Sequence, residues 1–184
     1  MLPDHRLASL GLDLLSPWDP RRVQPASVDL TLSGDFLELR DLPPTERDGV
    51  PVVDPQVPQS YTHVHVPDGG EYLLRPGTFV LGSTVERVTL TRFFVGLLSG
   101  KSSLARLGLV IESAGFLDPG FSGTVTLELA NLTPYALVLR PGMAIGQLSV
   151  IALVDRADRP YGDPGLGSHY QGQEGPTGSR FTRG

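Results

Sequence analysis

The stretch "GTVTLELANLTPYALVLRPGMAIGQLSVIALV", residues 123–154, decides the fold of this chain. It contains three apolar runs, which are separated by an Asn-Leu-Thr-Pro turn and an Arg-Pro-Gly turn. In the first run every second residue is apolar from Val125 to Leu129, and the residues between them are polar. A period of two is typical of a β-strand with one buried face. The stretch therefore predicts consecutive antiparallel strands joined by tight turns.

Further β-type runs precede this stretch and are separated by Gly, Pro or Asn. They are "SVDLTL" at 27–32, "EYLLRPG" at 71–77, "TFVLGSTVERVTL" at 78–90 and "FFVGLLSG" at 93–100. Residues 4–15 space their leucines at helical intervals, which predicts a short N-terminal helix. No long helical pattern lies between the strand signals. We therefore expect a mainly β protein, a distorted antiparallel barrel or jelly-roll-like fold with short helices.

The composition limits the function classes. The chain has 184 residues, of which 40% are hydrophobic, and this suits one domain with a sizeable core. Its net charge of −5 argues against a broad nucleic-acid-binding surface. The absence of cysteine excludes disulfides, thiolate metal sites and a cysteine nucleophile. No apolar run approaches the ~20 residues that span a bilayer. Because we also see no secretory signal pattern, we expect a cytoplasmic protein without membrane partners.

Two segments depart from the strand pattern. Residues 41–70 contain six prolines and form a long excursion, with one strand expected near "YTHVHV" at 61–66. Residues 156–184 are rich in glycine and polar groups and cannot build a core of their own. This tail is either a disordered terminus or an arm that orders over a ligand, because Tyr161, Tyr170 and Phe181 are unusual in a solvated tail. We divide the chain into a barrel domain at 1–155 and a C-terminal arm at 156–184.

The only lysine, Lys101, lies in the polar cluster "SGKSSLARLG" at 99–108. A cation beside two hydroxyl groups and near Arg106 is a natural anion cradle, since lysine supplies a compact charge and arginine a planar fork. The alternative is a polar turn ahead of a short helix. A phosphate-binding P-loop is excluded, because three residues separate Gly96 from Gly100 where that motif needs four.

Two carboxylates are candidates for chemistry. Glu128, in the middle of an apolar strand, is either solvated or held in a partly dry pocket that would suit acid–base work. Asp118 lies in a Pro/Gly turn between Phe116 and Phe121. It either caps its own turn or accepts a hydrogen bond from a sugar or base while an aromatic ring packs on the sugar.

Metal sites built from side chains have weak support. His63 and His65 could share one face of a strand as ligands, but a lone His-x-His pair is more often structural or exposed. The zinc deaminase signature needs cysteines, which this chain lacks. We expect no metal held directly by the protein, and no zinc.

Seven strings together resemble the dCTP deaminase family, part of the trimeric dUTPase-like superfamily. They occur in family order between Gln24 and Arg180: "QPASVDLTL", "FVLGSTVE", "GKSSLARLGL", "SAGFLDPGFSGTVTLELAN", "LRPGMAIGQLS", "RPYG" and "YQGQEGPTGSR". The resemblance implies a dUTPase-type barrel that forms a homotrimer with active sites between subunits. It implies zinc-independent hydrolytic deamination of dCTP to dUTP, with Mg²⁺ bound through the triphosphate. dCTP and dUTP are then the small-molecule ligands, and inhibition by dTTP is left open.

The resemblance also assigns roles to residues. Glu128 matches the glutamate that shuttles protons and activates water, Ser102 and Arg106 match residues that order this water and the glutamate, and a carbonyl around Ala114 holds the water. The matching nucleotide contacts are Lys101, Ser102, Ser103, Arg106, Asp118, Thr126, Leu127, Glu128, Gln147, Tyr161, His169 and Gln173.

Two departures from the family pattern and one match to its bifunctional branch bear on which reaction we expect. His169 replaces a usual lysine at the triphosphate, which would make that contact pH-dependent. The loop between Leu109 and Asp118 is one residue shorter than in typical deaminases and is similar in length to that of some dUTPases. Gly115 and Phe116 resemble the bifunctional branch, which also removes pyrophosphate to give dUMP. The alternatives are a dUTPase without deamination and a nucleotide-binding regulator without turnover.

Overall fold

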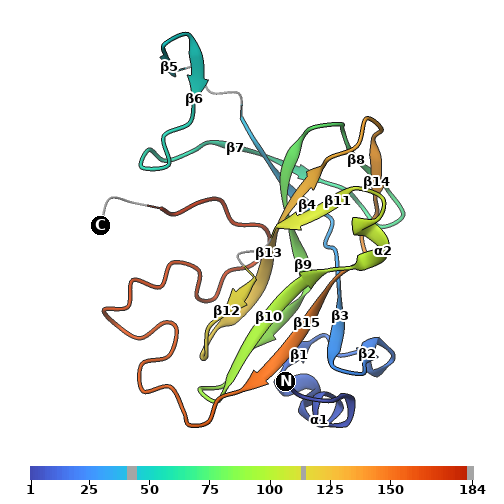
Figure 1. Cartoon of the computed structure of the whole chain (residues 1–184), viewed down its shortest axis with the longest axis vertical. Helices are drawn as coiled ribbons and strands as arrows, with labels where there is room; N and C mark the ends of the chain where they lie inside the picture. The colour runs from blue at the N-terminus through green and yellow to red at the C-terminus, as the bar shows by residue number, and fades with distance from the viewer. Residues whose placement is uncertain (41–44, 113–114, 182–184) are drawn as a thin grey trace.

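The computed structural model describes residues 1–40, 45–112 and 115–181, and within them it is mainly β (Figure 1). The helical elements are short: α1 (Asp4–Leu10), α2 (Ser102–Ala105) and the 3-10 turns η1 (Gly11–Asp13) and η2 (Pro20–Arg22). All the pairings between named strands are antiparallel. The expected fold class is therefore confirmed. None of the described helices is long and apolar enough to cross a membrane.

Two sheets carry the structure. The first has the order β11-β13-β9-β4-β7, with β1 also paired to β9, and the second has the order β12-β10-β15-β3-β2. The strands of the first sheet are β1 (Leu15–Ser16), β4 (Asp35–Leu39), β7 (Tyr61–His65), β9 (Phe79–Thr89), β11 (Leu109–Glu112) and β13 (Ser122–Asn131). Those of the second are β2 (Val23–Gln24), β3 (Ser27–Thr31), β10 (Phe94–Gly100), β12 (Phe116–Leu117) and β15 (Ala144–Ala152). Two small ribbons complete the fold, β8 (Tyr72–Leu74) with β14 (Leu137–Leu139) and β5 (Thr45–Arg47) with β6 (Val50–Val52).

The core consists of the apolar side chains that the sequence pattern points inward. Burial alternates residue by residue along the whole of β13, so the period of two is confirmed there. The core members Val28 and Leu30 of β3 are fully buried, and Leu7 of α1 packs in the same cluster. The short N-terminal helix is confirmed too. It ends at Leu10, and the next residue, Gly11, has a φ of +48°, a conformation that favours glycine.

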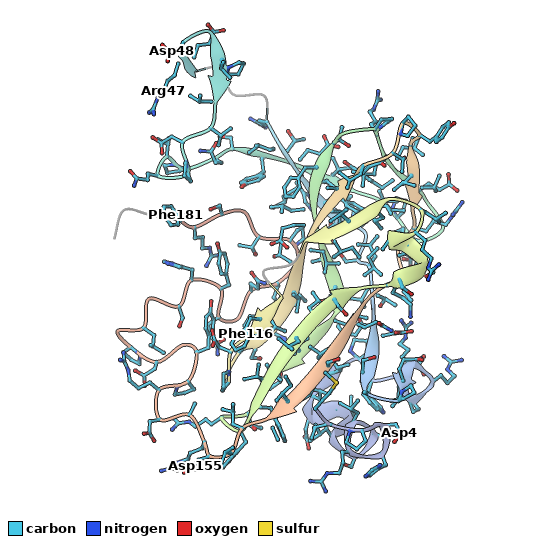
Figure 2. The ribbon with its side chains drawn as sticks, in the orientation of Figure 1. Asp4, Arg47, Asp48, Phe116, Asp155 and Phe181 are labelled. Atoms are coloured by element: carbon cyan, nitrogen blue, oxygen red, sulfur yellow. The ribbon has the colours of Figure 1, made fainter. Side chains whose placement is uncertain are left out.

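The excursion at 41–70 contains more structure than the sequence predicted. The expected strand is present as β7, but the hairpin β5–β6 was missed, and it projects away from the two sheets with Asp48 at its turn (Figures 1 and 2). The signal was hidden because β6 contains Pro51 and is mostly exposed, so it shows no alternation. β4, preceding the excursion, was also missed although Phe36 at its second position is fully buried.

An irregularity in β9 ties the two sheets together. Its register with β13 shifts between Thr124 and Thr126, so that the segment around Thr84 and Glu86 leaves the regular ladder. The Thr84 hydroxyl accepts a hydrogen bond from Val125 N–H at 2.9 Å and so satisfies the backbone donor in the irregular region. Glu86, 4% exposed, accepts from both the backbone N–H and the hydroxyl of Thr31 on β3. The two sheets are thus joined by buried polar contacts as well as by apolar packing.

The C-terminal segment lies against the part of β13 that no strand of the described residues covers on that side. β11 pairs with β13 only from Glu128 onward, so the first half of β13 is open on that side. There Gly172 N–H donates to Ser122 O at 2.7 Å, and Thr124 N–H donates to Gln173 O at 3.1 Å. The arm thereby satisfies backbone groups that a bare strand edge would leave to water. Figure 1 shows this segment running from the end of β15 along the side of the sheets and back toward β13.

We predict that Asn131→Ala destabilises the barrel. Asn131 is buried, and its amide group donates to Leu74 O and Tyr135 O while its oxygen accepts from Thr133 N–H, so one side chain holds the turn between β13 and β14 against β8. Loss of these partners should lower the free energy of unfolding by about 2–3 kcal/mol, measured by urea denaturation. The exposed Ser9→Ala should change it by less than about 0.5 kcal/mol. Equal values for the two variants would contradict this role of Asn131.

Candidate functional site

A cavity of about 440 Å³ lies between β13, β12 and the C-terminal arm. This volume falls within the range of small-molecule sites, about 300–1,000 Å³. Its lining residues are Leu39, Tyr61, Phe79, Leu81, Leu98, Gly115, Phe116, Leu117, Asp118, Phe121, Val125, Thr126, Glu128, Tyr161, Tyr170, Gln173, Thr177 and Ser179. We call it the Glu128 cavity. The wall is mostly apolar and aromatic, with a few polar groups, as is usual for a site that binds a ring system.

Glu128 enters this cavity because of the strand alternation. Leu127 and Leu129 on either side are fully buried in the core, so the side chain of Glu128 projects from the opposite face of β13. Its backbone is held between Leu81 of β9 and Glu112 of β11 in the register of the sheet. The residue is half-buried and its Oε2 atom is fully buried. A carboxyl group in a partly dry pocket with apolar walls is suited to proton transfer.

Asp118 lies at the mouth of the same cavity. It follows β12 in a turn closed by a hydrogen bond from Phe121 N–H to Asp118 O at 3.1 Å. The carboxylate is exposed, and no residue in the described part of the chain is seen to hydrogen-bond it. Phe121 beside it is buried, and its ring lies 5.8 Å from that of Tyr161. Asp118 is therefore available to a ligand next to an aromatic surface, rather than capping its own turn.

The arm supplies one wall of the cavity. Gln173 donates from Nε2 to Thr124 O at 2.7 Å, and Thr177 N–H donates to the Thr126 hydroxyl at 3.1 Å. Ser179 N–H donates to the Tyr61 hydroxyl of β7. The tail is thus seated across β13 and β7, and the interpretation as a disordered terminus does not hold for its described part. That it orders over a ligand stays a prediction.

A second cavity of about 280 Å³ adjoins the first and shares Asp118, Tyr161 and Tyr170 with it. Arg159 and His169 also line it, and both come from the arm. His169 is exposed, so its predicted contact with a nucleotide would be made at the surface of the protein.

The remaining polar candidates form a separate group, the Lys101 patch, made up of Asp29, Lys101, Ser102, Ser103, Arg106 and Gln147. None of them lines the Glu128 cavity. Lys101 Nζ donates to Asp29 Oδ2 at 2.6 Å, and Gln147 Nε2 donates to Asp29 Oδ1 at 3.2 Å. Ser102, Ser103 and Arg106 lie in and directly after α2 and are exposed. Within one chain, the predicted site is therefore split into two parts.

The remaining predicted site residues differ in whether they reach the Glu128 cavity. Gly115 and Phe116 line the Glu128 cavity, and Figure 2 shows Phe116 on the side of the sheet along which the arm runs. The side chain of Leu127 is fully buried in the core, so its predicted nucleotide contact can involve only its backbone. Ala114 lies outside the described residues.

The His63 and His65 side chains contact an acidic residue that was not predicted from the sequence. His63 and His65 share one face of β7, and one ring nitrogen of each contacts Asp35 Oδ1. The distances are 3.0 Å from His63 Nε2 and 2.9 Å from His65 Nδ1. Across the described ranges, no group of three His, Asp or Glu side chains is arranged so that it could hold a metal ion.

Three contributors to these groups were missed from the sequence. Tyr61 and Tyr170 line the Glu128 cavity from distant segments. Tyr170 had been noted in the tail but not assigned to the site, and only the folded chain brings the two together. Asp29, on the polar face of the strand "SVDLTL", was not considered as a site residue. Its signal was present, since an acidic residue stands among apolar neighbours in "SVDLTL" as Glu128 does in "TVTLELA".

Two groups away from the cavity and the Lys101 patch have shifted pKa values. Hydrogen bonds from Arg21 lower the pKa of the Asp19 carboxyl to about 2. Burial, with a hydrogen bond to Glu38 at 2.7 Å, raises the pKa of Tyr72 well above its usual value. The Tyr72 ring stacks on Phe36 with centroids 4.2 Å apart, so this pair is part of the packing of the barrel.

Two antiparallel sheets and a largely apolar cavity, of which the C-terminal arm supplies one wall, define a mainly β protein with a cavity of small-molecule size. The solved structure of 2'-deoxycytidine 5'-triphosphate deaminase from Agrobacterium tumefaciens is similar in fold, with a TM-score of 0.63 and 21% identity over 81% of this chain and 46% of that one. A dCTP deaminase-like family model matches residues 2–153. The chain belongs to the dCTP deaminase-like family.

Curated relatives agree with this assignment. A protein of Thermobifida fusca is 49% identical over 92% of this chain and 87% of its own length, and it is named "dCTP deaminase, dUMP-forming". A protein of Salinispora tropica with the same name is 46% identical over 98% of this chain and 94% of its own length.

We predict that Gly123→Ala loosens the arm without weakening the barrel. A Cβ at Gly123 would lie 3.0 Å from the carbonyl oxygen and 3.2 Å from the amide nitrogen of Gln173, so the arm must shift to admit it. Trypsin should then cleave the arm after Arg156 and Arg180 several-fold faster than in the original protein. The free energy of unfolding should stay within about 0.5–1 kcal/mol, because alanine is compatible with the strand conformation there. Unchanged cleavage rates would show that the arm is not held at this point.

Proposed function

We propose that this protein deaminates dCTP and hydrolyses the resulting dUTP to dUMP and pyrophosphate, in the cytoplasm. The observation that carries the proposal is Glu128, held by β13 in a largely apolar cavity beside Thr126 and Asp118. The names of the curated relatives support both steps, since they are called dUMP-forming. Gly115 and Phe116, which pointed to the bifunctional branch, line the same cavity.

In the proposed deamination, the cytosine ring occupies the Glu128 cavity and a water molecule attacks its C4 carbon. The Glu128 carboxylate takes a proton from this water as the C–O bond forms and passes it to N3. It then takes the remaining proton from the new hydroxyl group on C4 and passes it to the amino group. The C4–N bond breaks, ammonia leaves, and the ring becomes uracil. The Thr126 hydroxyl shares this face of β13, and Asp118 would accept a hydrogen bond from the deoxyribose. In the second step, water attacks the α-phosphorus, and pyrophosphate leaves.

The triphosphate is assigned to the Lys101 patch. Lys101 and Arg106 supply positive charge and Ser102, Ser103 and Gln147 supply neutral hydrogen-bond donors, which is the chemistry that phosphate oxygens need. We expect Mg²⁺ to bind through the phosphate oxygens of the nucleotide, where it neutralises their charge. The donor set fits this, because both oxygens of Asp29 already accept hydrogen bonds from the patch itself.

The separation of the two parts supports a homotrimer with shared sites. Ser102 and Arg106 are predicted to order the water on Glu128, yet they are exposed and lie outside the Glu128 cavity of their own chain. A closed ring of three copies would let the Lys101 patch of one chain complete the Glu128 cavity of the next. In such a site, dTTP is a candidate inhibitor, because it carries the same triphosphate with a base that has no amino group to lose.

The proposal is tested by the products. The protein is incubated with Mg²⁺ and either dCTP or dUTP, and the nucleotides are resolved by chromatography. We expect dUMP and pyrophosphate from dCTP with no more than a trace of free dUTP. Accumulation of dUTP would indicate a deaminase alone, activity on dUTP alone would indicate a dUTPase, and binding without products would indicate a regulator.

Glu128→Gln should remove deamination while leaving nucleotide binding largely intact. The amide has the shape of the carboxylate but cannot accept the proton, and loss of a general base reduces rates by about 10²–10⁴-fold. The turnover rate with dCTP and the Kd of dCTP measured by calorimetry give the two values. Glu71→Gln is the matched control, since Glu71 is an exposed partner of Arg140 outside both cavities. Retained turnover in Glu128→Gln would remove the proposed mechanism.

A mixing experiment tests the shared site. Glu128→Gln and Arg106→Ala should each be inactive alone, but trimers assembled from both should regain activity, because some interfaces combine an intact Glu128 with an intact Arg106. Random assembly of equal amounts restores about a quarter of the wild-type sites. The recovered rate is measured after co-refolding of the two variants. No recovery would mean that each chain builds its site alone.

A further inference from the structure

The Lys101 patch contains one group that opposes its expected ligand. Asp29 is a carboxylate in the middle of the groups to which we assign the triphosphate, and its side chain is only 13% exposed. A negative charge close to a polyanion weakens binding unless it does something that outweighs the repulsion. The resemblance assigns no role to Asp29.

The contacts of Asp29 indicate what that role is. Its Oδ2 accepts from Lys101 Nζ at 2.6 Å, and its Oδ1 accepts from Gln147 Nε2 at 3.2 Å. One carboxylate therefore holds two predicted phosphate contacts at once. Lys101 has three N–H donors and the Gln147 amide has two, so after these bonds two donors remain on the lysine and one on the glutamine.

The position of Asp29 is fixed by the sheet. On β3 it stands directly opposite Gln147 of β15, and Gln147 stands opposite Ser99 of β10, so the three strands are in register at this point. Two residues further along β3, Thr31 is bonded through its N–H and its hydroxyl to the buried Glu86. Asp29 thus has a rigid base, whereas Lys101 has a long side chain with many rotamers at the start of a short helix.

We propose that Asp29 is a positioning residue that holds Lys101 and Gln147 in the arrangement that binds the triphosphate. A lysine already held in place loses less rotamer entropy when phosphate binds, and this offsets the repulsion between Asp29 and the ligand. The effect is exerted on nucleotide binding and not on bond breaking. The inference rests on the proposed function, because it takes the Lys101 patch as the triphosphate site.

The test is a double-mutant cycle with Asp29→Asn and Lys101→Met. Asp29→Asn keeps the size of the side chain but removes the charge that holds the lysine. We expect it to raise the KM for dCTP about tenfold, equivalent to about 1.4 kcal/mol, with kcat unchanged within about twofold. In the Lys101→Met background, the same change should alter KM by less than about twofold, because the main group it positions is gone. Glu71→Gln, which breaks an exposed ion pair with Arg140, is the control and should leave KM unchanged.

Three results would overturn the inference. Asp29→Asn could lower KM, which would mean that repulsion dominates. It could act equally in both backgrounds, which would mean that it does not work through Lys101. It could instead change the Mg²⁺ concentration needed for half-maximal activity, in which case Asp29 serves the metal.

A second variant and a binding measurement separate the role of Asp29 from folding and from the proposed function. If Asp29→Asn does not fold, Asp29→Ser replaces it, and failure of both while Lys101→Met folds would show that Asp29 supports the barrel and not the lysine. Binding of inorganic triphosphate, measured by calorimetry, separates this inference from the proposed function. If the wild-type protein does not turn over dCTP, the proposed function is wrong. The positioning role is wrong if Asp29→Asn binds inorganic triphosphate as tightly as the wild-type protein does.

Discussion

The strict two-sidedness of β13 is the constraint on which the rest of this protein depends. One face of the strand is fully buried, and Leu127 and Leu129 anchor it in the core. A slip of one residue would put these leucines into the cavity and Glu128 into the core, and both changes are costly. The stability of the barrel therefore also fixes the position of the proposed catalytic carboxylate. Chemistry and folding share one strand, so the face of the sheet on which Glu128 lies is set by the hydrophobic burial of its neighbours.

The open edge of β13 explains the place of the arm. A strand that is paired on both sides along its whole length would leave the arm no backbone groups to bind. Because β11 pairs with β13 only from Glu128 onward, the donors and acceptors between Ser122 and Thr124 can bond Gly172 and Gln173. The arm thus forms backbone hydrogen bonds with β13 as an added strand would. These bonds hold Tyr170, just before Gly172, in the wall of the cavity. Gly123 makes this possible, since it leaves room for the Gln173 backbone.

The separation of the Lys101 patch from the Glu128 cavity is the observation behind the proposed dependence of the reaction on assembly. The patch is organised by β3, β15 and α2, whereas the cavity is organised by β13, β12 and the arm. Buried contacts between Glu86 and Thr31 connect the sheets that carry the two parts. In the proposed trimer a neighbouring copy completes each site, and an isolated chain would hold the general base Glu128 without the residues proposed to order the water.

The sequence by itself determined the fold class, most of the strands and the side of β13 on which Glu128 lies, because period-two burial is a local property that each strand carries in its own residues. It did not reveal β4, the β5–β6 hairpin or the cavity-lining Tyr61, because exposed or short strands have no clear alternation and distant side chains meet only in the folded chain. Tertiary structure alone decided that Lys101 is held by Asp29 and stands apart from Glu128. Strand order and register cannot be read from single strands, since pairing between segments as distant as β3 and β15 is set by the packing of the whole core.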